Sequence, residues 1–121
     1  MAGTNWPDGI LTKGGIKSDG VAAADALGYD TGAGGAVTQI TNRTTGVTLS
    51  KLSGAITTNT ASLAAEASAD FVVTNTLVAI GDVPVLAIRS GSNGGGTLVQ
   101  VIAVDAGSFT IRVLNGNDPP G

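Results

Sequence analysis

The feature that most limits the fold of this chain is a change of pattern near residue 36. Residues 1–36 hold nine of the 19 glycines and only isolated apolar side chains. A glycine inside a helix or strand costs about 0.5–1 kcal/mol relative to alanine, so this composition disfavours regular structure. After residue 36, apolar and polar residues alternate in short runs, as they do in half-buried strands. The sequence therefore predicts an extended, Gly-rich N-terminal arm over residues 1–36 and a β-domain over residues 37–121.

The alternating runs predict seven short strands joined by turns. The last two are joined by Asp105-Ala106-Gly107, which predicts a tight antiparallel hairpin. In the last strand, alternation predicts that Phe109, Ile111 and Val113 form the inward face. Pro84 lacks a backbone N–H, which places its strand at a sheet edge or puts position 84 where no ladder hydrogen bond is needed. Residues 62–69 are Ala-rich and are expected to form a loop. The fold class is thus all-β, an antiparallel sandwich or jelly-roll-like domain with an extended N-terminal arm. The expected strands are 37–40, 47–52, 55–58, 70–74, 83–89, 98–104 and 108–114.

Composition removes most kinds of small-enzyme chemistry. The chain has no histidine and no cysteine, which excludes imidazole bases, Cys–His nucleophiles and zinc sites of the Cys/His type. Three carboxylates near strand ends, Asp70, Asp82 and Asp105, are the candidates for a glycosidase pair, but Asp is common at such turn positions. The glycine-rich segments 32–37 and 92–96 lack the context of nucleotide-binding loops. We therefore expect no enzyme activity, no cofactor and no metal.

Charge and hydropathy indicate the kind of partner. Six Lys and Arg residues are scattered over a chain of net charge −3, which argues against nucleic acid. The longest apolar stretches are six residues, far short of the ~20 of a membrane helix. Yet mean hydropathy is +0.31 although only 3% of residues are aromatic. A monomer with a small hydrophobic core and many apolar residues is expected to bury part of its apolar surface against another subunit or a larger assembly.

Two segments stand out as candidate binding elements. In the arm, Trp6 lies beside the turn at Pro7-Asp8-Gly9 and is expected to anchor in a pocket on a partner; the alternative is packing on its own sheet. The other segment is a strand-joining tip that is expected to be exposed. The arm residues expected to bind capsid or a neighbouring subunit are Trp6, Ile10, Leu11, Ile16 and Val21, and the exposed loop comprises Ser92, Asn93, Gly94, Gly95 and Gly96.

Several stretches resemble, in the same order, a β-rich module of tailed-bacteriophage structural proteins. They are residues 28–39, 43–57, 71–76, 82–85 and 103–109, so the resemblance covers about residues 28–115. Modules of this kind occur in capsid decoration (cement) proteins and in head or tail fibres. One departure is that the module continues into a further apolar strand, whereas this chain ends at Asn115-Gly116-Asn117-Asp118-Pro119-Pro120-Gly121. That difference puts the completeness of the last sheet in question.

The resemblance implies a non-enzymatic virion part, a homotrimer on the outer surface of the capsid that is made in the host cytoplasm. Its expected partners are the major capsid protein and further copies of itself, with no nucleic acid and no membrane. The expected function is capsid decoration that stabilises the head. The alternative is a tail- or head-fibre receptor-binding module in which the tip at residues 91–96 touches a host glycan.

Overall fold

The computed structural model describes residues 32–91 and 96–116. These residues form strands and loops and contain no helix, which confirms the all-β fold. The loop expected at 62–69 is present up to the start of the fourth strand, with a turn closed by Ala67 N–H donating to Ala64 O. The strands are β1 (Gly34–Thr38), β2 (Val47–Thr48), β3 (Ser53–Thr57), β4 (Ser68–Thr74), β5 (Thr97–Asp105) and β6 (Ser108–Asn115).

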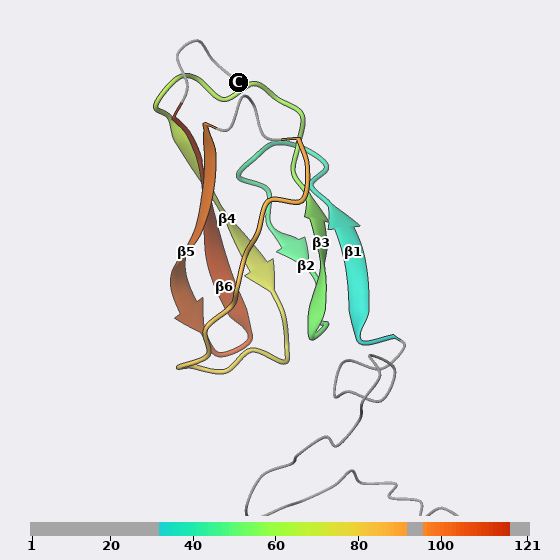
Figure 1. The fold of residues 1–121 in the computed structure, drawn as a ribbon. Coiled ribbons are helices and arrows are strands. Elements are labelled where there is room, and N and C mark those ends of the chain that lie inside the picture. The colour runs from blue at the N-terminus through green and yellow to red at the C-terminus, as the bar shows by residue number, and fades with distance from the viewer. Residues whose placement is uncertain (1–31, 92–95, 117–121) are drawn as a thin grey trace, which may run out of the picture.

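The strands form two sheets with mixed pairing. One sheet has the order β2-β4-β6-β5, and the other is the pair β1-β3 (Figure 1). β4, β6 and β5 pair antiparallel, but β1 pairs parallel with β3 and β2 pairs parallel with β4. The sequence predicted antiparallel pairing throughout. In each parallel pair the two strands are separated by a long connection, residues 39–52 between β1 and β3 and residues 49–67 between β2 and β4, as a parallel crossover requires.

The β5–β6 hairpin lies where the sequence predicted it. Asp105 pairs with Ser108, and Gly107 has a φ of +83°, a conformation that glycine adopts without strain. The register shifts between Val101 and Ala103, so Ile102 forms a β-bulge. The hairpin is therefore the locally determined part of the larger sheet.

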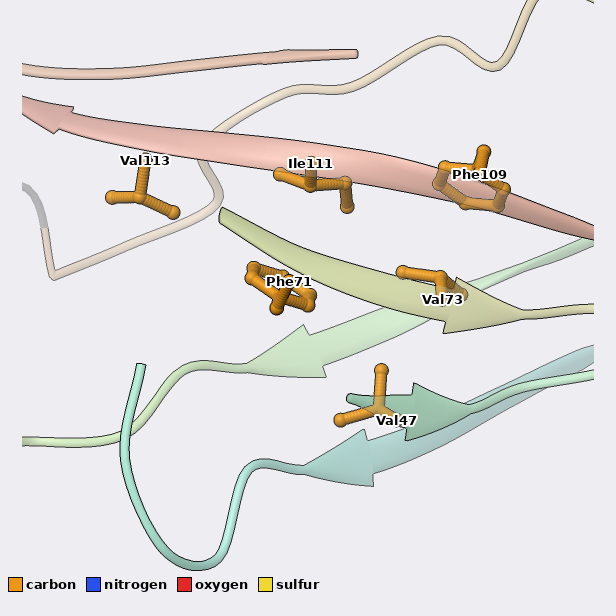
Figure 2. Close-up of a cluster of buried hydrophobic side chains, with 6 residues drawn as sticks. All are labelled: Val47, Phe71, Val73, Phe109, Ile111 and Val113. Atoms are coloured by element: carbon orange, nitrogen blue, oxygen red, sulfur yellow. The ribbon is translucent and has the colours of Figure 1, made fainter. Parts of the chain in front are cut away.

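The core lies on the inner face of the four-stranded sheet (Figure 2). The inward residues predicted for the last strand, Phe109, Ile111 and Val113, are buried there. Val37 of β1 and Ile56 of β3 pack against this cluster from the two-stranded sheet, which gives the domain its sandwich-like character. The buried cluster consists of Val47, Phe71, Val73, Phe109, Ile111 and Val113.

Glycines in β1 and β3 allow these two strands to pack closely. β1 begins at Gly34, so residues 34–36, grouped with the arm on composition, are paired with β3. Gly35 lies in register with Gly54. A Cβ atom at Gly54 would lie 2.7 Å from the carbonyl oxygen of Gly35 and 2.7 Å from Cδ2 of Leu49. The two strands and the Leu49 side chain can therefore approach only because position 54 has no side chain.

A buried glutamine ties the loop after β1 to the residues after β3. Gln39 is 2% exposed; its Nε2 donates to the carbonyl oxygens of Arg43 at 3.1 Å and Thr45 at 2.9 Å. Its Oε1 accepts a hydrogen bond from the backbone N–H of Asn59 at 3.0 Å. One side chain thus satisfies three backbone groups, which matches its almost complete burial.

We expect Gln39→Leu to lower the free energy of unfolding by about 2 kcal/mol or more, because leucine leaves these backbone groups without partners. Urea denaturation of the full chain measures the effect. Thr38→Val, at the exposed neighbouring position in β1, is the matched control and should change stability far less. Equal stability of both variants would show that the three hydrogen bonds contribute nothing.

The prediction of a strand at 83–89 is wrong. Residues 83–91 run alongside the domain between the four-stranded sheet and β3, and belong to neither sheet (Figure 1). Within the described residues, the backbone of this 83–91 segment makes no hydrogen bond. Its alternating side chains are those of a strand, but Pro84 has no N–H to donate, and no described strand is hydrogen-bonded to the segment.

Candidate interaction site

Two adjoining clefts lie between β3 and the 83–91 segment. The larger has a volume of about 660 Å³ and is lined on its two sides by residues 54–60 and residues 85–91. The smaller has a volume of about 430 Å³ and is lined by residues 51–54 and residues 82–86. Gly54, Ile56, Val85 and Leu86 line both. The two clefts are therefore consecutive parts of one groove that follows β3.

The floor of this groove is the core itself. Phe71, Ile111 and Val113 line the larger cleft, and Val73 and Phe109 line the smaller. Five of the six side chains in the buried cluster thus contribute to the floor. In a closed sandwich such side chains face the other sheet; here they are buried and also line the groove.

The 83–91 segment is apolar on both of its faces. Pro84 and Leu86 are half-buried and point inward, and Leu86 packs against the core. Val83 and Val85 alternate with them and are 82% and 91% exposed. A strand with apolar residues on both faces is typical of one covered on both sides. Among the described residues, none covers the outer face.

Further exposed apolar side chains lie near the smaller cleft. Leu52 and Leu77 line it, and both are more than half exposed. Ile80, three residues after Leu77, is 77% exposed. Large apolar side chains in such a group mark interaction surfaces more often than single ones do. We therefore identify the groove and its rim as the candidate interaction site.

The charges of the groove are unequally distributed. Arg43 and Arg89 line the larger cleft, and among the described residues no carboxylate does. The Nε of Arg43 donates to the carbonyl oxygen of Ala61 at 2.6 Å, which holds the guanidinium in place. Lys51 and Asp82 line the smaller cleft, and their opposite charges offset each other. The larger cleft is thus the positive part of the groove.

The candidate carboxylates have structural partners or lie apart from the groove. Asp70 and Arg112 form a two-pronged ion pair across β4 and β6, with Nε–Oδ1 and Nη2–Oδ2 distances of 2.7 and 2.8 Å. Asp82 Oδ2 accepts a hydrogen bond from the backbone N–H of Ala79. Asp105 ends β5 at the hairpin. Within residues 32–91 and 96–116, no three acidic groups gather as a metal site would require.

The ion pair predicts a pH effect. The hydrogen bonds from Arg112 lower the pKa of Asp70, with a further contribution from the positive charge. The pair therefore stabilises the folded chain above the unfolded-state pKa of about 4, and this contribution is lost as the pH falls through the lower folded-state value. We expect Asp70→Asn to melt below the wild type at pH 7, and the difference to vanish on acidification. Thermal melts from pH 7 to pH 2 measure this, with Asp105→Asn as the control; a difference independent of pH would contradict it.

The sequence-predicted binding residues lie mostly outside the described residues. This applies to Trp6, Ile10, Leu11, Ile16 and Val21 of the arm, and to Ser92, Asn93, Gly94 and Gly95 of the loop. Gly96 is described; it is half-buried, and its carbonyl oxygen accepts a hydrogen bond from Gly116 N–H at 2.8 Å.

Sequence reasoning missed the groove. The signal available was the run from Val83 to Ile88, which is apolar at adjacent as well as alternate positions and contains a proline. That combination favours a segment covered on both faces but unable to complete a ladder.

No helix in the described part of the chain is long and apolar enough to span a membrane. Comparison of the chain with protein-family models, with curated protein sequences and with solved structures finds no match.

Proposed function

We propose that this protein is a structural virion component, a capsid decoration protein that binds the outer surface of the head and stabilises it. The observation that carries the proposal is the open groove, whose floor is the core and whose rim exposes Val83 and Val85 almost completely. Surface of this kind in a chain of few charges is best accounted for by burial in an assembly. The likeness of residues 28–115 to phage structural modules supports the same assignment.

In this proposal the partners are the major capsid protein and two further copies of the chain. The β-domain forms the homotrimer, and the arm of each copy extends over the capsid or onto a neighbouring subunit. Three arms on one trimer raise one another's effective concentration at the surface, so contacts that are weak singly give durable attachment. The protein acts by joining neighbouring shell subunits, and no step of chemistry is involved.

Co-sedimentation with heads tests this function. Heads assembled from the major capsid protein of the same virus are mixed with increasing amounts of the full chain and pelleted. We expect saturable binding at a fixed ratio of chain to shell subunit, and none to heads already decorated. The full chain remaining in the supernatant at every concentration would overturn the proposal.

Light scattering after size exclusion tests the trimer separately. The expected mass is three times the chain mass of 11.8 kDa. A single species with the mass of one chain would contradict self-association of the domain.

A further inference from the structure

We propose that the groove between β3 and the 83–91 segment is a strand acceptor, which binds an extended segment of another protein that carries apolar side chains at alternate positions and a carboxylate at the end near Arg43 and Arg89. This inference deepens the proposed function, on which it rests, because it names how the domain itself contacts a shell protein.

The backbone of both rims supports a strand as the occupant. Within residues 32–91 and 96–116, β3 pairs with β1 along one edge, and its other edge borders the groove. On the opposite rim, the 83–91 segment makes no backbone hydrogen bond within the described residues. A strand between them would pair with both rims and complete the second sheet. A helix satisfies its own backbone groups and would leave both rims unpaired.

The side chains of the groove determine which strand fits. Successive residues of a strand point to opposite faces, so one set of alternate side chains of the occupant would face the floor of Phe71, Ile111 and Val113. That set must be apolar. The other set would lie beside Val83 and Val85, whose exposed side chains would become its same-face neighbours. Burying those two valines would remove the most exposed large apolar side chains of the segment from water.

The two arginines of the larger cleft indicate which end of the bound strand carries the carboxylate. Arg43 and Arg89 line the larger cleft without a carboxylate among the described lining residues. Arg43 is already oriented by its hydrogen bond to Ala61 O, so little further conformational entropy is lost when it binds an anion. A carboxylate at that end of the strand is thus the complementary group, whereas a basic residue there would be repelled.

Peptide binding to the full chain tests the acceptor directly. The probe is a fluorescein-labelled seven-residue peptide of alternating valine and threonine that ends in glutamate. We expect saturable binding by fluorescence anisotropy, at least fivefold weaker when glutamine with a C-terminal amide replaces the acidic end. A peptide with proline at every second position, which cannot form a ladder, should not bind.

Variants of the rim formed by the 83–91 segment locate the bound peptide. Val85→Lys and Arg89→Glu should each weaken binding about tenfold, from lost apolar contact and from charge reversal respectively. Val72→Lys is the matched control, because Val72 is exposed on the opposite face of the four-stranded sheet. It should leave binding unchanged.

Three outcomes would overturn the acceptor. The first is no binding of the acidic peptide, and the second is equal loss in Val85→Lys and Val72→Lys. The third is self-association that Val85→Lys abolishes, which would make a second copy of the chain the occupant. None of these depends on heads. Loss of peptide binding with retained co-sedimentation would refute the acceptor alone, whereas the reverse would refute the decoration function alone.

Discussion

Replacing Phe71 by alanine is expected to lower the free energy of unfolding by about 3–5 kcal/mol, the range for removing a large aromatic side chain from a core. Phe71 is 3% exposed and lies near the middle of β4, paired with Ile111 of β6. Only one other phenylalanine stands in the chain, Phe109, so Phe71 supplies a large share of the bulky apolar volume. Because it also forms the floor of the larger cleft, alanine would deepen that cleft into the core. Urea denaturation of the full chain gives the difference.

Val72→Ala is the matched control for this variant. Val72 is the next residue of the same strand, points to the opposite face and is 45% exposed. Its truncation should change stability by about 1 kcal/mol or less, the span of strand propensities. If Phe71→Ala cost no more than Val72→Ala, the cluster around Phe71 would not be the part of the domain on which folding depends.

The alternation of apolar and polar residues correctly predicted those features of the fold that depend only on residues close together in the sequence. It placed Phe109, Ile111 and Val113 on the buried face of the last strand, and the glycine at position 107 marked the hairpin before it. Both features depend on alternation and on a turn, which are local properties of the chain. The all-β class followed from the same signals.

Pairing between distant segments could not be predicted in the same way. β1 pairs with β3 in parallel across a connection of 14 residues, and alternation does not specify whether a partner runs parallel or antiparallel. The close approach of Gly35 and Gly54 depends on that pairing. Composition alone therefore groups Gly34 and Gly35 with the glycine-rich arm, because it does not show that they pair with β3.

The groove could not be predicted because residues 83–89 have the sequence pattern of a strand but belong to no sheet. Residues 83–89 have the apolar content of a buried strand, and the sequence does not say what lies beside them. In the described structure nothing pairs with them, so their exposed valines and unpaired backbone become a surface. Binding residues proposed for the arm rest on composition and resemblance, and they lie outside the described residues.

Removing residues 1–20 is expected to weaken binding to heads by a factor of about 100 or more while leaving the domain folded. The removed segment holds Trp6, Ile10, Leu11 and Ile16, whereas every member of the buried cluster lies between Val47 and Val113. Urea unfolding of the shortened chain should therefore stay within about 1 kcal/mol of the full chain. In the proposed trimer, attachment through several weak contacts would fail steeply when one class of contact is lost from every subunit, because each arm would raise the local concentration of the others.

Trp6→Ala separates anchoring by one ring from the contribution of the arm as a whole. If the indole fills a pocket on the shell, this single change should cause much of the loss seen on deletion, since a buried aromatic anchor commonly contributes 2 kcal/mol or more, about a 30-fold change in affinity. Thr12→Ala, at a polar position of the same arm that is not among the expected binding residues, is the control and should have a small effect. Undiminished sedimentation of the shortened chain would assign attachment to the β-domain, and the groove beside β3 would then be the surface that holds the shell.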